Sequence, residues 1–162
     1  MDSGPGLSGI GSMVASGGIT TAASTEPGAY MKLVSTRLIT DDIQRMVEFY
    51  QHVTGVDATW ATPDFAEIVT PAGTLALGST RTVALFAEGS ARPADNHTAI
   101  IEFLVPDVDA DYRRLRETVE GFVNEPTTMP WGNRSLLFRD PDGNLINLFT
   151  PVTEQAVAKF AG

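Results

Sequence analysis

Hydrophobic and polar residues alternate along several short segments of the chain, which is typical of β-strands with one face on a core. The clearest example is the stretch 133–149, where two alternating runs flank Asp140-Pro141-Asp142-Gly143-Asn144. Proline presets one turn dihedral and glycine accepts a positive φ, so this turn is compatible with a tight connection. The stretch therefore predicts a β-hairpin.

A second stretch of this kind, residues 65–77, precedes the first by a constant interval. Three matched pairs lie 70 positions apart: Pro71 and Pro141, Gly73 and Gly143, and Leu75 and Leu145. Two candidate helix starts, at Asp42 and Asp107, lie 65 positions apart. The different intervals indicate loops of different length within one repeated unit, and the chain therefore contains an internal duplication.

The first unit, module one, spans residues 32–89. Residues 32–40 alternate like a strand, and residues 41–53 place apolar side chains at helical spacing between a capping residue and Gly55. The pattern then predicts strands at 57–62, 65–69 and 73–78, with 82–86 as a continuation or an extra strand.

The second unit, module two, spans residues 97–152 and repeats this order. Its expected elements are a strand at 97–105, a helix at 107–119, a strand at 122–126 and the hairpin. The chain is thus expected to be an α+β protein of two tandem βαβββ modules. Residues 153–162 are expected to form a C-terminal helix or tail.

Residues 1–31 differ from the rest in composition. They hold seven of the fifteen glycines by residue 30, are otherwise rich in serine, threonine and alanine, and show no sustained periodicity. Such a segment buries too little surface to offset its ordering entropy, so it is expected to be a disordered tail. The first basic residue is Lys32, which argues against a signal peptide. Met31 is interpreted as a natural start, preceded by an added extension or a misplaced start, and the alternative is a functional tail.

Charge and composition exclude several classes of function. The formal net charge of -9 would repel phosphate groups, so a nucleic-acid partner is not expected. The absence of cysteine excludes disulfides, thiolate catalysis and cysteine-bound zinc. Without an apolar run of membrane-spanning length, the protein is expected to be soluble and cytoplasmic, with no membrane partner.

Three motifs in order resemble the vicinal oxygen chelate superfamily, which includes the glyoxalase, bleomycin-resistance-protein and extradiol-dioxygenase fold. They are TDDIQRMVEFYQHVTG, VPDVDADYRRL and PWGNRSLLFRDPDGNLINLF. The resemblance covers residues 32–152 as one glyoxalase-like domain and implies curved sheets around a common cleft, usually in a homodimer. It says much less about the reaction.

The metal-dependent members of that family hold their ion with His or Glu at four strand positions. Aligned on the motifs, these positions here are Ser35, Leu77 (or Leu85), Ile100 and Asn147. Divalent metals of this class need imidazole or carboxylate ligands, which these residues do not supply. The resemblance therefore predicts a member without a metal or any other cofactor.

Strand alternation selects the residues that would face the cleft. Glu102, Arg37 and Asn147 fall on the concave face by parity, and Trp60 and Trp131 lie on or beside strands that would border it. Arg37 and Glu102 are 65 positions apart and are therefore equivalent in the repeat. Glu102 could form a salt bridge with Arg37 or face a ligand, and the sequence leaves both interpretations open. We expect these five residues to bind the ligand in one cavity.

Three functional classes remain. The first is a binding protein that holds a planar or cationic small molecule in a metal-free cleft. The second is an isomerase or lyase in which Glu102 or Glu67 acts as a general base, and the third is a structural or regulatory dimer with no ligand. Whether the protein is an enzyme is left open by the sequence.

Overall fold

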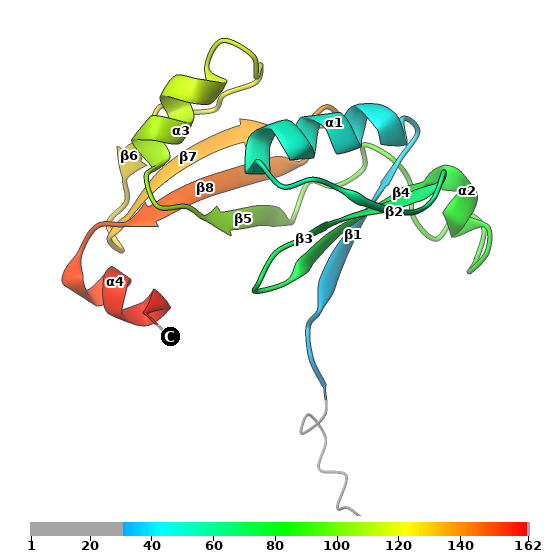
Figure 1. The fold of residues 1–162 in the computed structure, drawn as a ribbon, viewed down its shortest axis with the longest axis horizontal. Helices are drawn as coiled ribbons and strands as arrows, with labels where there is room; N and C mark the ends of the chain where they lie inside the picture. The colour runs from blue at the N-terminus through cyan, green and yellow to red at the C-terminus, as the bar shows by residue number, and fades with distance from the viewer. Residues whose placement is uncertain (1–30, 162) are drawn as a thin grey trace, which may run out of the picture. The chain divides into compact units, whose positions relative to one another are not determined.

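The computed structural model describes residues 31–161, and its strands form two four-stranded mixed sheets that correspond to the two predicted modules (Figure 1). Residues Leu33–Gly162 make up one compact unit. The expected α+β fold of two βαβββ modules is confirmed. The proposed disordered tail falls almost wholly outside the described residues.

Sheet A belongs to module one and has the strand order β1-β4-β3-β2. Strand β1 pairs with β4 in parallel, and the other pairs are antiparallel. Its elements are β1 (Ser35–Thr40), α1 (Ile43–Thr54), β2 (Thr59–Thr62), β3 (Phe65–Val69), β4 (Thr74–Ser79) and α2 (Thr80–Val83).

Sheet B belongs to module two and repeats this topology with the order β5-β8-β7-β6. Strands β5 and β8 are parallel, as β1 and β4 are in sheet A. Its elements are β5 (Ile100–Leu104), α3 (Val108–Leu115), β6 (Thr127–Thr128), β7 (Asn133–Arg139), β8 (Leu145–Pro151) and α4 (Glu154–Phe160).

The two crossover helices begin in the same way. The Asp42 carboxylate accepts a hydrogen bond from the Arg45 amide at 3.0 Å, and the Asp107 carboxylate accepts one from the Ala110 amide at 3.0 Å. These bonds satisfy backbone donors that the first turn of a helix leaves free. The interval of 65 residues between the two caps is therefore a structural repeat.

The repeat interval of the strands after the two turns is one residue longer than the repeat interval of the turn residues. Ser35 pairs with Thr74 in sheet A and Ile100 pairs with Leu145 in sheet B, so the equivalent strand positions lie 71 apart instead of 70. The reason is the turn itself. The first closes between Thr70 and Gly73, whereas the second closes between Asp140 and Asn144 and contains one more residue.

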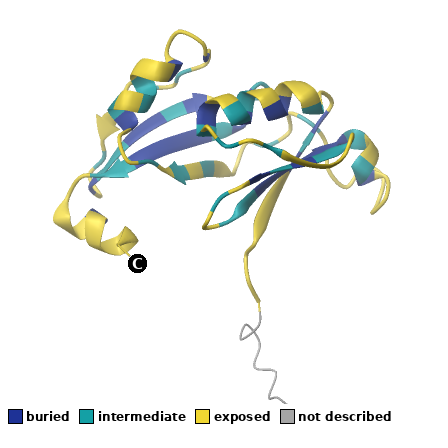
Figure 2. Cartoon of the chain, in the orientation of Figure 1, coloured by how far each residue is buried: buried dark blue, intermediate teal, exposed yellow. Residues whose placement is uncertain are grey.

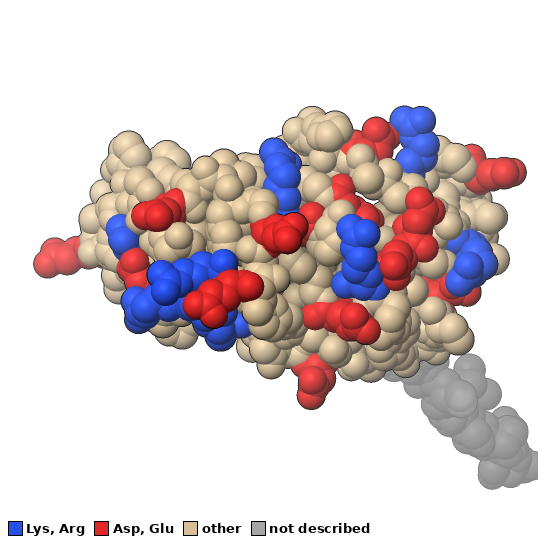
Figure 3. Space-filling model, turned by 90° about the horizontal axis from the view of Figure 1, so that it is seen from above, with Lys and Arg blue, Asp and Glu red and all other residues tan. Residues whose placement is uncertain are grey.

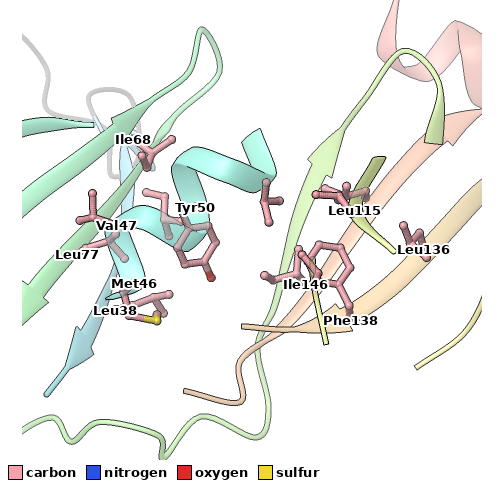
Figure 4. Packing of buried hydrophobic residues seen from close by; sticks show 14 of the residues in the cluster. Leu38, Met46, Val47, Tyr50, Ile68, Leu77, Leu115, Leu136, Phe138 and Ile146 are labelled. Carbon is pink, nitrogen blue, oxygen red and sulfur yellow. The ribbon is translucent and has the colours of Figure 1, made fainter. Parts of the chain in front are cut away.

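One face of each sheet forms the core beneath α1 and α3. The buried side chains fall into a group from sheet A and α1 and a group from sheet B and α3 (Figure 4). In Figure 2, the central parts of β7 and β8 are buried, while the outward faces of α1 and α3 are exposed. The core members include Leu38, Met46, Val47, Tyr50, Ile68, Leu77, Leu115, Leu136, Phe138 and Ile146.

Helix α1 joins the two modules through a buried hydrogen bond. The hydroxyl of Tyr50 donates to the Asp140 carboxylate at 2.8 Å, in the turn between β7 and β8. Burial and the neighbouring carboxylate raise the pKa of Tyr50 above its ordinary value. Arg114 of α3 donates in return to the carbonyl oxygens of His52 and Val53, at 2.7 and 2.8 Å.

Two of the expected strands are corrected by the structure. Residues 82–86 do not form a strand, because helix α2 and the turn that follows it occupy this stretch. Residues 122–126 contain only an isolated bridge from Phe122 to Phe138, and the short strand β6 begins at Thr127. Short apolar runs of this length fit either element, so periodicity alone could not decide between them.

The surface that carries α1 and α3 is charged but mixed in sign. Figure 3 views the molecule from above Figure 1, and acidic and basic side chains alternate over this face without a large area of either sign. Asp109 and Arg134 form one of its ion pairs, with a nitrogen–oxygen distance of 2.7 Å. Among residues 31–161, no helix is long and apolar enough to cross a membrane.

Candidate functional site

The sheet faces opposite the core carry the candidate site. In β5, Ile101 and Phe103 pack against the core, while Ile100, Glu102 and Leu104 are exposed on the other face. The predicted parity of this strand is confirmed. We call this second face of each sheet its concave face, after the curvature of the fold.

Glu102 is held in place by its neighbour on the next strand. Glu102 and Asn147 are register partners in the parallel pair β5–β8, and the Asn147 side-chain amide donates to a Glu102 carboxylate oxygen at 2.9 Å. A side-chain hydrogen bond across a strand pair restricts the rotamers of both residues. The carboxylate is thus oriented, although its residue stays exposed to solvent.

Polar atoms continue along the concave face of sheet B. The Oδ1 atoms of Asn147 and Asn133 and the Oγ of Ser135 are buried and have no hydrogen-bond partner within residues 31–161. Ser135 pairs with Phe149 and Asn133 with Pro151, so these residues share the face that carries Asn147. Buried polar atoms usually have partners, so these three atoms represent hydrogen-bonding capacity that the described residues leave unused beneath this face.

Helix α4 covers one end of this face. Phe160 of α4 packs against Phe149 with ring centroids 5.3 Å apart and ring planes tilted by 55°, and Figure 1 shows α4 on the side of sheet B opposite α3. Gly132, with φ of 91°, makes room for this helix, because a Cβ atom there would lie 2.1 Å from Thr153 Oγ1. The rest of the face, towards Ile100 and Glu102, is open.

Arg37 occupies the equivalent place on the concave face of sheet A. Its guanidinium carbon lies 4.7 Å from the ring centroid of Phe65 and 5.5 Å from that of Phe86. Both distances are within the range of cation–π attraction. Arg37 and Glu102 form no ion pair with each other in the described part of the chain, because each finds a partner beside its own sheet.

A cleft of about 330 Å³ lies between the edges of the two sheets. Glu102 and Ile100 line it from β5, and Ser35 and Thr74 line it from β1 and β4. Arg37 follows Ser35 by two positions on the same strand face and borders a separate, smaller cavity of about 120 Å³ beside Asn96 and Asn144. The structure therefore places the two charged residues on adjoining parts of the concave surface.

The two tryptophans lie elsewhere. Trp60 pairs with Ala66, a core residue, so it lies on the helix-bearing face of sheet A, in the edge strand farthest from β1. The prediction that it borders the concave cleft is corrected, because the parity of β2 could not be read from its sequence. Trp131 is 66% exposed in the turn before β7 and borders none of the cavities described above.

The structure thus brings together two of the five predicted residues, Glu102 and Asn147, and places Arg37 near them on the neighbouring sheet. The sequence-based reasoning missed Ser135 and the contact of Phe65 and Phe86 with Arg37. Strand parity relative to Leu136 could have identified Ser135. The position of Phe86 could not have been found, because its segment was expected to be a strand.

The register of the strands shows which side chains occupy the positions that hold the metal in the metal-dependent members of the family. The structural equivalent of Asn147 is Ala76 and not Leu77, which points into the core, so the motif-based alignment was one residue out. Residues at matched register positions form layers across the two faces. One layer contains Arg37, Ala76, Glu102 and Asn147, and the layer beside it contains Ser35, Thr74, Ile100 and Leu145. Glu67 pairs with Ala76 and joins the first layer, so these layers offer two carboxylates, one on each sheet. Residues 31–161 contain no group of three or more His, Asp or Glu side chains placed to hold a metal.

Comparison with known proteins agrees with this architecture. The sequence profile described as Glyoxalase/Bleomycin resistance protein/Dioxygenase superfamily matches residues 32–148. The uncharacterized protein YraH of Bacillus subtilis (strain 168) is 30% identical over 125 residues, which cover 74% of this chain and 98% of that protein.

Solved structures show the same fold. A glyoxalase/bleomycin resistance protein/dioxygenase from Nocardioides superposes with a TM-score of 0.63 at 24% identity, over 76% of this chain and 85% of the other. A family enzyme from Burkholderia phytofirmans PsJN gives a TM-score of 0.65 at 18% identity, over 75% of this chain and 100% of the other. With the profile match and the paired βαβββ modules, these findings show that the chain belongs to the Glyoxalase/Bleomycin resistance protein/Dioxygenase superfamily.

Proposed function

We propose that the protein binds a small organic molecule on the concave surface beside Glu102, as a glyoxalase/bleomycin-resistance-like binding protein that needs no metal. The observation that carries this proposal is the Glu102–Asn147 pair. Asn147 orients the Glu102 carboxylate, which lines a cleft and has no basic partner among the described residues. Charged groups in such a position are commonly completed by a ligand.

The surroundings of Glu102 define the class of ligand. Ile100 and Leu104 flank it on β5 and are 49% and 51% exposed. An apolar surface next to a carboxylate fits a molecule that has a flat or apolar body and a cationic or N–H-donating head. A net charge of -9 also attracts a cation over longer distances.

Three isosteric probes test this ligand class. Benzamidine is a planar cation, benzamide is its neutral counterpart and benzoate is the anion. We expect benzamidine to bind at about millimolar concentration, which corresponds to roughly 4 kcal/mol, and benzamide to bind at least about tenfold more weakly. Binding is measured by heteronuclear NMR at constant ionic strength, so that the shifts are followed residue by residue.

The decisive variant is Glu102→Gln, which keeps the shape and the acceptor for Asn147 but removes the charge. It should reduce benzamidine affinity to that of benzamide. The matched control is Glu117→Gln, an exposed glutamate in the turn after α3, which should have no effect. Equal binding of benzamidine by Glu102→Gln and the parent chain would refute the proposal.

A general-base role for Glu102 is the second candidate. It is favoured by the Asn147 hydrogen bond, which orients the carboxylate, and it would make the protein an isomerase or lyase. Such a base would exchange the C–H proton next to the carbonyl group of a bound substrate with solvent. Deuterium incorporation from D₂O into a panel of small carbonyl compounds, lost in Glu102→Gln and retained in Glu117→Gln, distinguishes catalysis from binding. Homodimer formation stays a prediction, which light scattering at micromolar concentration checks.

A further inference from the structure

The Arg37 guanidinium contacts aromatic rings and has no carboxylate as an ion-pair partner among the described residues. Its Cζ atom lies over the rings of Phe65 and Phe86, 4.7 and 5.5 Å from their centroids. Cation–π contact with aromatic rings leaves guanidinium N–H groups available for hydrogen bonds. Among the described residues, no side chain or carbonyl oxygen accepts a hydrogen bond from Arg37, and no carboxylate lies within ion-pair distance of it.

Arg37 differs from the other arginines in its aromatic contacts. Four arginines form an ion pair within residues 31–161, namely Arg81, Arg92, Arg114 and Arg134, and Arg37 is among those that do not. It is the described arginine whose guanidinium lies over two aromatic rings. Glu67 is the acidic residue nearest in register, since it pairs with Ala76, the partner of Arg37. Even this carboxylate forms no ion pair with the guanidinium.

We propose that Arg37, held by Phe65 and Phe86, is a binding site for the oxyanion head group of a small organic ligand. A guanidinium edge presents parallel N–H donors that match the two oxygens of a carboxylate or phosphate group. The two rings fix the direction of that edge, so less side-chain entropy is lost when an anion binds. Phe86 is 76% exposed and follows helix α2, and contact with a ligand would account for an aromatic ring at this position.

The inference deepens the proposed function and rests on it, because Arg37 and Glu102 stand at repeat-equivalent positions of the two concave faces. Ser35, two residues before Arg37 on the same face, lines the cleft that Glu102 lines. Alternate residues of a strand are separated by about 7 Å. Arg37 thus lies one alternate strand position beyond the cleft that Glu102 lines, and borders a separate cavity.

The test is a titration of the parent chain with benzoate, phenyl phosphate and neutral benzamide at constant ionic strength. The readout is the NMR signal of the arginine Nε–H groups and of the Phe65 and Phe86 rings. We expect benzoate or phenyl phosphate to shift the Arg37 signal with saturation, and benzamide to bind at least about tenfold more weakly. The tighter of the two anions identifies the head group as carboxylate or phosphate.

Variants separate a specific site from general attraction to positive charge. Arg37→Met should abolish saturable binding of both anions and leave benzamidine affinity unchanged. Arg116→Met, a matched control at an exposed arginine at the end of α3, should leave anion affinity unchanged. Phe86→Leu should weaken anion binding several-fold while the fold remains intact, as judged by an unchanged spectrum elsewhere.

Three results would overturn the inference. They are equal anion binding by Arg37→Met and the parent chain, an equal loss in Arg116→Met, and shifts at Arg116 as large as those at Arg37. Failure of benzamidine to bind would refute the Glu102 proposal and leave the anion result unaffected. The reverse result, benzamidine binding without anion binding, would refute only the role of Arg37.

Discussion

The turns that precede β4 and β8 occupy the same place in the two modules but differ in what they contact. In module one, the Thr70 hydroxyl closes its own turn by bonding to the Gly73 carbonyl at 2.7 Å, and Pro71 is exposed. In module two, Asp140 is 5% exposed and its carboxylate accepts hydrogen bonds from Tyr50 and from two sites on Asn144. One copy of the duplicated turn is therefore a local surface feature, and the other connects the modules.

The concave faces show the same divergence. Equivalent positions carry Arg37 on sheet A and Glu102 on sheet B, the first stacked on aromatic rings and the second bonded to Asn147. Duplication thus preserved the backbone register, while the side chains at matched positions took on different roles.

Asp140→Ala should destabilise the protein by about 3 kcal/mol. The substitution removes a buried carboxylate and leaves the Tyr50 hydroxyl and the Asn144 amide without their acceptor, and hydrogen bonds to charged groups contribute about 1.5 to 3 kcal/mol each. The matched change in module one, Thr70→Ala, should cost about 1 kcal/mol or less, because its neutral hydroxyl bonds only within its own turn. Chemical denaturation of both variants measures the difference. Equal losses would contradict the assignment of the intermodule contact to the second turn.

Tyr50 gives a smaller, pH-dependent effect. Burial and Asp140 raise the pKa of Tyr50 in the folded state, so the folded protein retains a proton that the unfolded chain releases above about pH 10. This contribution to stability is fully present below that pH and is lost as the pH rises further, by about 1.4 kcal/mol per pH unit. Tyr50→Phe should remove the pH dependence and cost about 1.5 kcal/mol at neutral pH.

The check on Tyr50 is denaturant unfolding of the parent chain and Tyr50→Phe at pH 8 and at pH 11. The parent should lose more stability than the variant over this interval, because titration of lysines and the other tyrosines affects both proteins alike. Parallel losses would show that ionisation of Tyr50 is not linked to folding.

Much of the fold could be predicted from local signals. Hydrophobic alternation and the Asp140–Asn144 turn correctly predicted the hairpin of β7 and β8, and the capping aspartates identified α1 and α3. The strand predicted at residues 82–86 was wrong, because a run of four or five apolar residues fits a short helix as well as a strand. The change in the repeat interval from 70 to 71 residues could not be predicted from the sequence, since it depends on which residues close each turn.

The candidate site was only partly predictable. Parity within one strand placed Glu102 and Asn147 on the same face, since adjacent strands in register share their alternation. Parity could not place Trp60, because β2 contains a register shift between Trp60 and Thr62. The stacking of Phe86 on Arg37 depends on the path of the chain after α2, which no periodic pattern specifies.

The central claim is that the two concave faces bind opposite charges, and one NMR measurement tests it most directly. Benzamidine and benzoate are titrated separately into the ¹⁵N-labelled chain, and the backbone shifts are mapped. We expect benzamidine to perturb β5 and β8 around Glu102 and Asn147, and benzoate to perturb β1 and β3 around Arg37 and Phe65. Perturbation of the same residues by both probes, or shifts scattered over the helix-bearing face, would contradict the account.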